Sequence, residues 1–388
     1  MKSRLSATGY IKNNKRTCFV LILALGLTFM AMYIIAFILG ATTESFRPII
    51  FEYPRRISFA EVTTNAYSVK RSDFETIEEY AEAYGKEYKA FFEALSNDPD
   101  VTKVYDTQFL NATYNGVIGG IGYEFPLLPA EEIPFVAEHL GAVLTSGRMP
   151  EGEGEVVIDE IILKNGKMKI GDWFLENSYG QVFKVVGTLR SDGMACLGTP
   201  RGSYNSGWGF VVLCNDNSKD FTKLAAKYGV HVSEENGDNI SDAVTYKELW
   251  DKDIAGTIDS VMKVILLVVM IFLTISVLIA YISFMRNRVN EYCLYASIGY
   301  SKGEIYGMIM REMIILFLSG IVLGVITSLG MMKLLDMTVM EPRGLVSAWF
   351  MKDQLGRILG AFAVIVGILQ IPVMLSVHKI KTIDLMED

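Results

Sequence analysis

The sequence predicts an α-helical membrane protein with four transmembrane helices and a large extracytoplasmic α+β domain between the first two helices. Three observations predict this class. The chain of 388 residues is 51% hydrophobic, with a mean hydropathy of +0.30, only slightly more apolar than a soluble protein. Its apolar residues are concentrated in four uncharged runs. Its acidic residues are concentrated between the first and second runs, where helix and strand patterns occur together.

Each of the four runs is long enough to cross a membrane, because about 20 apolar residues span the hydrocarbon core as a helix. The runs contain 23, 22, 20 and 20 residues, and none includes Asp, Glu, Lys, Arg or His. Ion and proton pathways normally need such residues, so we expect a helix scaffold rather than a pore. The runs are 18–40, 264–285, 313–332 and 358–377.

The first run could instead be a cleaved signal peptide, because five basic residues precede it. Its 23 residues exceed the 7–15 of a signal-peptide core and no A-x-A site follows. We therefore expect a retained anchor.

The orientation of the chain follows from Lys and Arg, which are enriched in short cytoplasmic loops. Segments 1–17, 286–312 and 378–388 hold eleven of them, against four in 333–357. We expect a multi-pass protein of the plasma or inner membrane with both termini cytoplasmic. The predicted segments are 1–17 (cytoplasmic), 18–40 (helix 1), 41–260 (extracytoplasmic domain), 261–285 (helix 2), 286–312 (cytoplasmic loop), 313–332 (helix 3), 333–357 (extracytoplasmic loop), 358–377 (helix 4) and 378–388 (cytoplasmic tail).

The domain at 41–260 combines one helix pattern with several strand patterns. A Ser72-x-x-Glu75 capping box precedes apolar residues at steps of three and four, which are typical of a helix that packs on a sheet. We expect an α+β fold, with a second lobe at about 147–192. The apolar helix positions are Phe74, Ile77, Ala81, Tyr84, Tyr88, Phe91 and Leu95. The strand candidates are 57–62, 101–105, 109–114, 156–158, 182–189 and 210–213.

The charge and residue types of this domain exclude several functions. It holds 35 acidic and 20 basic residues, a net charge of −15, which argues against nucleic acid and favours cationic partners. Neither His139 nor His231 has a metal-ligand spacing around it, so we expect no metal site. Cys196 and Cys214 could pair in an oxidising compartment, although the sequence cannot show that they meet.

The chain lacks the parts of an enzyme that uses ATP. Its cytoplasmic pieces total only 55 residues, and no G-x-x-x-x-G-K-[ST] phosphate loop occurs. The nearest glycine cluster, 116–122, leads into Glu-Phe-Pro rather than into a helix, so we interpret it as a loop. We expect this chain to be no enzyme and to bind no cofactor. If its function uses ATP, a partner subunit holds the ATP and Mg²⁺.

The membrane runs contain glycines at a spacing of four. Gly320 and Gly324 lie in the third run, and Gly356 and Gly360 lie at the start of the fourth. This spacing permits close contact between helices. The alternative is that glycine is simply common in membrane helices.

The segment after the second run carries the most specific motif. Residues 288–305 read RVNEYCLYASIGYSKGEI, followed by Arg311-Glu312 and by Gly320-x-x-x-Gly324. This pattern resembles the signature of FtsX/MacB-like permeases of the ABC class. The lead-in at 10–17 and the stretch from Gly147-Arg-Met-Pro150 to Gly187 resemble the basic N-terminus and the MacB-type extracytoplasmic core domain of that family.

The resemblance implies a permease subunit that works by mechanotransmission. Two permease copies, as a homodimer or a related heterodimer, would act with an ABC-type ATPase to export or extract a peptide, lipopeptide, lipoprotein or drug. The alternative functions are an FtsX-like subunit that activates a cell-wall hydrolase and an antimicrobial-peptide sensing or resistance module. An extracytoplasmic adaptor or hydrolase could be a further partner. Residues 302–305 can begin a short coupling helix that docks on the ATPase. The implied docking residues are Gly299, Tyr300, Ser301, Lys302, Glu304 and Ile305, with Arg288 and Glu291 holding the loop ends.

Overall fold

The computed structural model describes residues 7–117, 119–174, 182–202, 209–215, 219–346 and 350–378. The chain forms two compact units. The helical unit contains Met1–Gly40, Ile258–Met337 and Ala348–Asp388, and the α+β unit contains Ala41–Thr257 and Thr338–Ser347. The first segment of the α+β unit thus ends at 257 rather than at the predicted 260. The unit also includes 338–347, which was predicted to be part of a separate loop.

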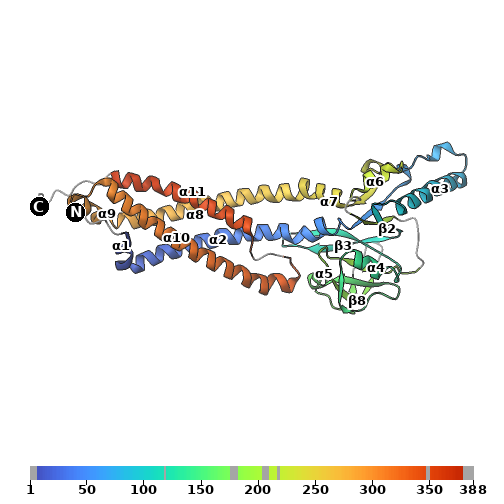
Figure 1. The fold of residues 1–388 in the computed structure, drawn as a ribbon, viewed down its shortest axis with the longest axis horizontal. Coiled ribbons are helices and arrows are strands. Elements are labelled where there is room, and N and C mark those ends of the chain that lie inside the picture. The colour runs from blue at the N-terminus through green and yellow to red at the C-terminus, as the bar shows by residue number, and fades with distance from the viewer. Residues whose placement is uncertain are drawn as a thin grey trace. The chain divides into compact units, whose positions relative to one another are not determined.

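The helical unit is built from long apolar helices (Figure 1). Within the part of the chain that is described, three helical stretches are long and apolar enough to span a membrane: Lys15–Glu52, Lys263–Arg286 and Lys302–Arg343. The fourth predicted span lies in a helix whose apolar part, Gln354–Ile368, is shorter, so the count of four is not confirmed. The helices are α1 (Ala7–Asn13), α2 (Lys15–Arg47), α8 (Gly256–Arg286), α9 (Val289–Ser297), α10 (Lys302–Leu335) and α11 (Lys352–His378).

Glycines allow α10 to approach α2 closely. A Cβ atom on Gly320 would lie 2.6 Å from the Cβ of Leu25, and one on Gly324 would lie 2.6 Å from the Cβ of Phe29. Both distances are shorter than carbon atoms tolerate, so only glycine fits at these two positions. The spacing of four residues brings both glycines to the same face of α10.

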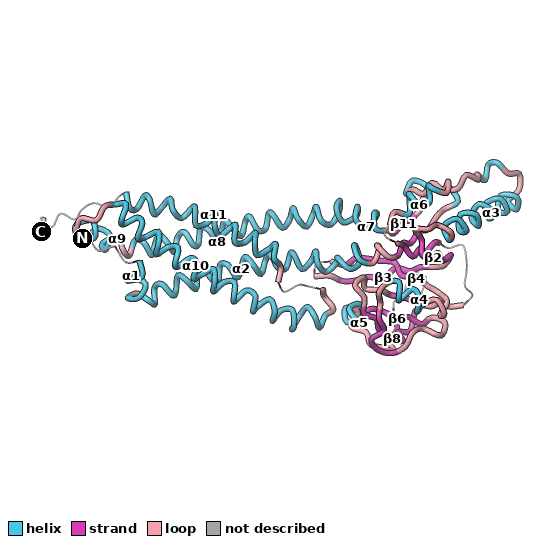
Figure 2. Tube along the Cα trace, viewed as in Figure 1, coloured by secondary structure: helices cyan, strands magenta, loops and turns pink. Residues whose placement is uncertain are grey.

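The α+β unit contains three separate sheets (Figure 2). The first sheet has the order β11-β1-β10-β2 and is antiparallel throughout, the second is the β3-β4 hairpin, and the third has the order β5-β8-β6-β9 with β7 paired to β8. In the third sheet β6 and β8 pair in parallel, whereas the other described strand pairs are antiparallel, and an isolated parallel bridge joins Leu127 to Gly198 of β9. The strands are β1 (Ile57–Glu61), β2 (Val101–Asp106), β3 (Phe109–Asn115), β4 (Gly120–Pro126), β5 (Val143–Gly147), β6 (Glu155–Asp159), β7 (Trp173–Phe174), β8 (Phe183–Arg190), β9 (Cys196–Gly198), β10 (Phe210–Cys214) and β11 (Asn239–Ser241).

All six strand candidates form strands, and the third sheet, within 143–198, corresponds to the predicted second lobe. The glycine cluster at 116–122 was wrongly interpreted as a loop, because Gly120 and Gly122 lie in β4 and pair with Asn115 and Thr113 of β3. The remaining helices of this unit are α3 (Ile77–Ser96), α4 (Ile133–His139), α5 (Glu160–Asn165), α6 (Phe221–Lys227) and α7 (Ala243–Leu249).

Helix α3 begins later than its sequence pattern suggested. Its capping box is formed by Thr76 and Glu79, not by Ser72 and Glu75. Only the C-terminal end of its apolar face is buried: Phe91 is 3% exposed, whereas Ile77 is 66% exposed. The prediction that the whole face packs on a sheet was therefore wrong for its N-terminal half.

The turn that opens the second lobe is fixed by an ion pair. Arg148 Nη1 donates to Glu155 Oε2 at 2.7 Å, and the backbone N–H groups of Glu151 and Gly152 donate to the same oxygen at 2.9 and 3.0 Å. The hydrogen bonds from Arg148 and from this backbone lower the pKa of Glu155 to about 2. Gly147 has a φ of +75°, and a Cβ there would lie 2.3 Å from the Val186 carbonyl oxygen.

The connection between α10 and α11 is anchored within the α+β unit. The Tyr114 hydroxyl, which is fully buried, donates to the Gly344 carbonyl at 3.2 Å and accepts from the Val346 N–H at 3.1 Å. Gly344 has a φ of +60°, and a Cβ there would lie 2.3 Å from the Ile161 carbonyl oxygen. Residues 338–347 are therefore held by specific hydrogen bonds rather than by apolar contact alone.

Candidate functional site

The candidate site is the junction between α8 and α10, where the sequence carries its most specific motif. The chain leaves α8 at Arg286, forms the short helix α9 and enters α10 at Lys302. Helix α1 also contacts α10 in this region. The site therefore combines four helices that lie close together in the helical unit.

Arg288 is the centre of this junction, although only 2% of it is exposed. Its guanidinium donates to both carboxylate oxygens of Glu312 in α10, with Nη2 to Oε1 at 3.3 Å and a shorter bond from Nη1 to Oε2. Its Nε donates to Oε2 of Glu291 in α9 at 3.1 Å. Because Glu312 is also 2% exposed, the two opposite charges compensate each other out of contact with water.

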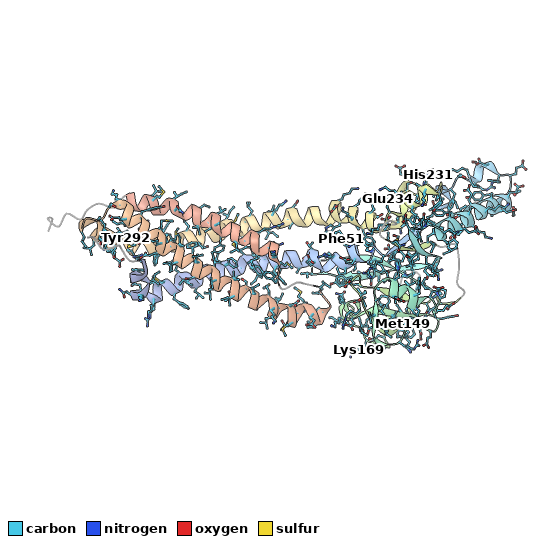
Figure 3. The ribbon with its side chains drawn as sticks, in the orientation of Figure 1. Phe51, Met149, Lys169, His231, Glu234 and Tyr292 are labelled. Atoms are coloured by element: carbon cyan, nitrogen blue, oxygen red, sulfur yellow. The ribbon has the colours of Figure 1, made fainter. Side chains whose placement is uncertain are left out.

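Aromatic rings complete the surroundings of Arg288. The ring centroid of Tyr10 in α1 lies 3.4 Å from the guanidinium carbon, and that of Tyr292 in α9 lies 5.0 Å from it. Tyr292 is labelled in Figure 3. Both separations lie within the range of cation–π attraction. One buried cation thus joins α1, α9 and α10 at the end of α8.

The C-terminus of α9 is a rigid turn formed by Gly299. The Tyr300 N–H donates to the Tyr295 carbonyl at 3.1 Å and the Gly299 N–H donates to the Ala296 carbonyl at 3.0 Å. With Gly299 at a φ of +94°, these are the two bonds of a Schellman motif. The glycine of the sequence motif is therefore required by the backbone conformation.

The N-terminus of α10 follows directly and is closed by a capping box. The Ser301 hydroxyl accepts from the Glu304 N–H at 3.3 Å, and the Glu304 carboxylate accepts from the Ser301 N–H at 2.8 Å. These two side chains therefore stabilise the start of α10. Capping of α10 is therefore an alternative to the implied role of Ser301 and Glu304 in contacting a partner.

Two further expectations about this segment differ from the structure. Residues 302–305 do not form a separate coupling helix, because they are the first turn of the continuous helix α10. The short helix of the junction is α9. Ile305 is fully buried, so its side chain is not available for docking.

The exposed surface of the junction lies instead on α9 and on the turn after it. Leu294 is 54% exposed and Ile298 is 62% exposed, and they are separated by one helical turn. Lys302 is also exposed, and Tyr300 is partly exposed. We call Leu294, Ile298 and Lys302 the α9 face. It presents apolar side chains beside a positive charge on a backbone that is fixed at both ends.

The other predicted site residues have varied surroundings. Among the described atoms, nothing would lie within 4 Å of a Cβ on Gly356 or Gly360, so the structure shows no helix contact at these positions. No disulfide joins Cys196 and Cys214, both of which are described. Cys196 lies in the third sheet, and Cys214 lies in the first with its Sγ 3.2 Å from the Ser58 hydroxyl. Throughout the described ranges, no cluster of three His, Cys, Asp or Glu side chains could hold a metal.

Four residues that contribute to the junction were not assigned to it by sequence reasoning. Tyr10 carries no local signal, because its contact with Arg288 joins residues 278 positions apart. Glu312 was noted only as part of a spacing. Leu294 and Ile298 could have been found from their i, i+4 spacing on a short helix outside the apolar runs.

Comparisons with known proteins match part of the chain to a family model and part of it to solved structures. Residues 263–385 match the family model described as FtsX-like permease C-terminal. No curated protein sequence matches the chain. Two solved structures are similar to the chain. The periplasmic region of MacB from Actinobacillus actinomycetemcomitans is 14% identical with a TM-score of 0.25, and the match covers 53% of this chain and 96% of that one. The extracellular domain of the noncanonic ABC-type transporter YknZ from Gram-positive bacteria is 12% identical with a TM-score of 0.24, and the match covers 48% of this chain and 99% of that one.

Proposed function

Since residues 263–385 match the FtsX-like permease C-terminal model, we propose that this chain is the membrane subunit of an ABC-type complex whose ATPase docks on the α9 face. The ATPase, which would hold ATP and Mg²⁺, is a separate subunit. The permease works as a dimer with four spans per chain, cytoplasmic termini and the α+β unit outside. The complex exports or extracts a peptide, lipopeptide, lipoprotein or drug.

The observation that supports docking is the exposure of apolar side chains on α9. Leu294 and Ile298 lie outside the apolar runs, on a short helix that the Schellman turn and the capping box hold in place. A short helix that presents apolar residues one turn apart is suited to a groove on a partner protein. Lys302 adds a positive charge at the edge of the same surface.

The contacts behind this face provide a route for motion. A displacement of α9 is transmitted to α10 through the turn at 298–301 and through the Arg288–Glu312 ion pair. It reaches α2 through the close contacts at Gly320 and Gly324. The far end of α10 continues into residues 338–347, which belong to the α+β unit. ATP-driven movement at α9 would thereby alter the conformation of the α+β unit.

The test is co-purification of ATP hydrolysis with an affinity-tagged chain from its own membranes in mild detergent. Ile298→Glu should reduce the co-purifying ATPase activity at least tenfold, because it places a charge in the proposed apolar contact. Val143→Glu is the matched control, since Val143 is 67% exposed but lies in β5 of the α+β unit. It should leave the activity unchanged.

Two outcomes would contradict the proposal. A wild-type chain that carries no ATPase activity would refute the assignment to an ABC complex. Equal activity in the Ile298→Glu and Val143→Glu variants would refute docking at α9. If turnover responds to a cell-wall hydrolase rather than to candidate peptides, the signalling function replaces transport.

A further inference from the structure

Helix α3 carries a row of aromatic side chains that the core of the α+β unit covers only in part. Tyr84, Tyr88 and Phe92 follow one another at steps of four residues and are each partly exposed. The Tyr88 ring stacks on Phe210 of β10 with 5.2 Å between centroids, and the Tyr84 ring meets Tyr67 edge-on at 5.2 Å. These contacts hold the rings in place while one side of the row stays accessible.

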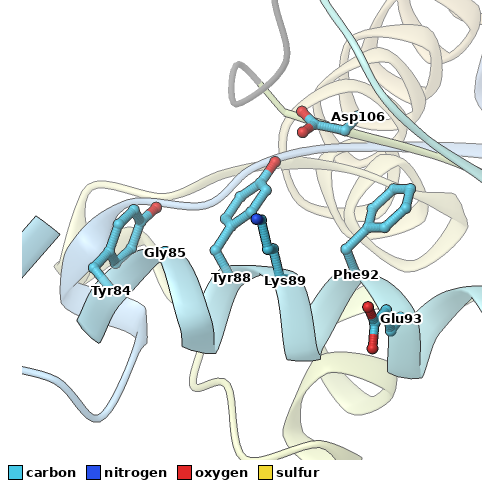
Figure 4. Close-up of a pocket in the computed structure, with 7 residues that line it drawn as sticks. All are labelled: Tyr84, Gly85, Tyr88, Lys89, Phe92, Glu93 and Asp106. Carbon is cyan, nitrogen blue, oxygen red and sulfur yellow. The ribbon is translucent and has the colours of Figure 1, made fainter. Parts of the chain in front are cut away.

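The accessible side of the row borders a groove between α3 and the end of β2 (Figure 4). Its volume is about 320 Å³, within the range of sites that hold a small ligand or a few side chains. Besides the three rings, it is lined by Gly85, Lys89, Glu93 and Asp106. The groove lies wholly within the α+β unit and apart from the α9 face.

Gly85 lines the groove at a position where packing does not require a glycine. A glycine in a helix interior costs about 1 kcal/mol relative to alanine. Among the described residues, however, nothing would lie within 4 Å of a Cβ on Gly85, so no neighbour requires its small size. The missing side chain instead widens the groove between Tyr84 and Tyr88.

The groove combines aromatic faces with negative charge. Asp106 is the last residue of β2, where its pairing with Phe210 fixes the backbone, and the Tyr88 hydroxyl points toward its carboxylate (Figure 4). Burial raises the pKa of Tyr88, so its hydroxyl stays neutral beside Asp106. Glu93 and Asp106 against Lys89 leave a net negative lining, and α3 itself has five Glu and two Lys.

These features match one kind of ligand. A guanidinium stacks on aromatic rings and forms paired hydrogen bonds with a carboxylate, which an ammonium group does less well. The aromatic row continues beyond the groove to Tyr80, which stacks on Tyr84 at 6.2 Å, and to the exposed Ile77. An apolar neighbour of the bound residue could therefore also be accommodated.

We propose that this groove on α3 binds an arginine side chain of a cationic peptide that also carries apolar residues. Tyr84 and Tyr88 supply ring faces, Asp106 supplies the carboxylate, and the strip from Tyr80 to Ile77 contacts the adjacent apolar residue. The site requires no ATPase, so it is tested separately from the proposed function.

The test is calorimetric titration of the full chain, in nanodiscs of uncharged phosphatidylcholine at about 150 mM salt. The probe is acetyl-Arg-Phe-Arg-Phe-Arg-amide, and its matched control carries citrulline, a neutral isostere, in place of each arginine. The citrulline peptide should bind at least tenfold more weakly. Asp106→Asn should raise the Kd of the arginine peptide at least tenfold.

Two further variants separate a specific site from general acidity. Glu82→Gln removes an exposed carboxylate of α3 that pairs with Lys86 at 2.8 Å outside the groove, and it should change the Kd less than twofold. Gly85→Leu places a side chain in the groove from a Cβ position that no described atom approaches within 4 Å, so it should abolish binding while the unfolding midpoint is not lowered. Equal weakening by Asp106→Asn and Glu82→Gln, unchanged binding in Gly85→Leu, or equal affinity for the citrulline peptide would each overturn the proposal.

Discussion

Replacing Arg288 by methionine tests the buried ion pair at the junction most directly. Methionine keeps much of the side-chain length but removes the cation that faces the Glu312 carboxylate. Arg288 and Glu312 are each only 2% exposed, so the remaining charge would be buried without compensation. Breaking such a pair by removing one partner typically costs about 3–5 kcal/mol. We expect a loss of unfolding free energy in this range.

The double variant Arg288→Met with Glu312→Met makes the prediction specific. Replacing both partners of a buried ion pair by apolar residues is often neutral. We therefore expect the double variant to recover most of the loss, which leaves a coupling of about 3 kcal/mol or more between the two positions. Arg286→Met is the matched control, because Arg286 is exposed and carries the same charge.

The assay is unfolding of the purified chain in mixed micelles with increasing SDS, followed by the helical circular dichroism signal. The midpoints and slopes of the wild type, the single variants Arg288→Met and Glu312→Met, the double variant and Arg286→Met give the differences in unfolding free energy. If Arg288→Met behaves like Arg286→Met, the ion pair does not stabilise the junction. If the two substitutions simply add, the compensation of charge argued above is wrong.

Three further predictions concern other contacts. Glu155→Gln should lower the free energy of unfolding by about 1.5–3 kcal/mol at neutral pH. Because the folded-state pKa of Glu155, about 2, lies below its ordinary 4.5, this stabilisation is present above about pH 4.5 and is lost as the pH falls toward 2. An acid titration of the unfolding midpoint should show this loss only in the wild type. Gly324→Leu should destabilise the helical unit by about 1–3 kcal/mol in the SDS assay, because Gly324 packs against Phe29. Gly330→Leu should not, since no described atom lies within 4 Å of a Cβ at that position. Equal effects would contradict the close contact between α2 and α10 at Gly324. Tyr114→Phe should lower the local opening free energy by about 1–3 kcal/mol and so speed hydrogen exchange in residues 338–346. Tyr123→Phe should leave this exchange unchanged, because no described atom bonds the Tyr123 hydroxyl. Equal exchange in both variants would show that the Tyr114 hydroxyl does not hold this segment.

The sequence predicts the elements of this protein better than their surroundings. Uncharged runs identify three clear spans, and alternating apolar residues identify six strands, because these signals are local. The hairpin strand β4 was missed because two of its seven residues are glycines, which are rare in strands. Its pairing with β3 depends on the partner strand rather than on its own composition.

The junction shows the same limit. The positions of Gly299 and Ser301 predicted a break between two helices, and the structure explains it by a Schellman turn followed by a capping box. Burial could not be predicted in the same way. Ile305 and Leu294 are both aliphatic, yet one is fully buried and the other is 54% exposed, because neighbouring helices cover only one of them.

The anchored connection at 338–347 has a practical consequence for isolating the α+β unit. A soluble fragment of 41–257 would lack the segment that bonds the Tyr114 hydroxyl and that covers the Ile161 carbonyl. Truncation would expose the apolar surface beneath Val346 and leave buried polar groups to water. Appending residues 338–347 through a flexible linker should restore these bonds, so such a permuted fragment is better suited to crystallisation and ligand screening than the contiguous one.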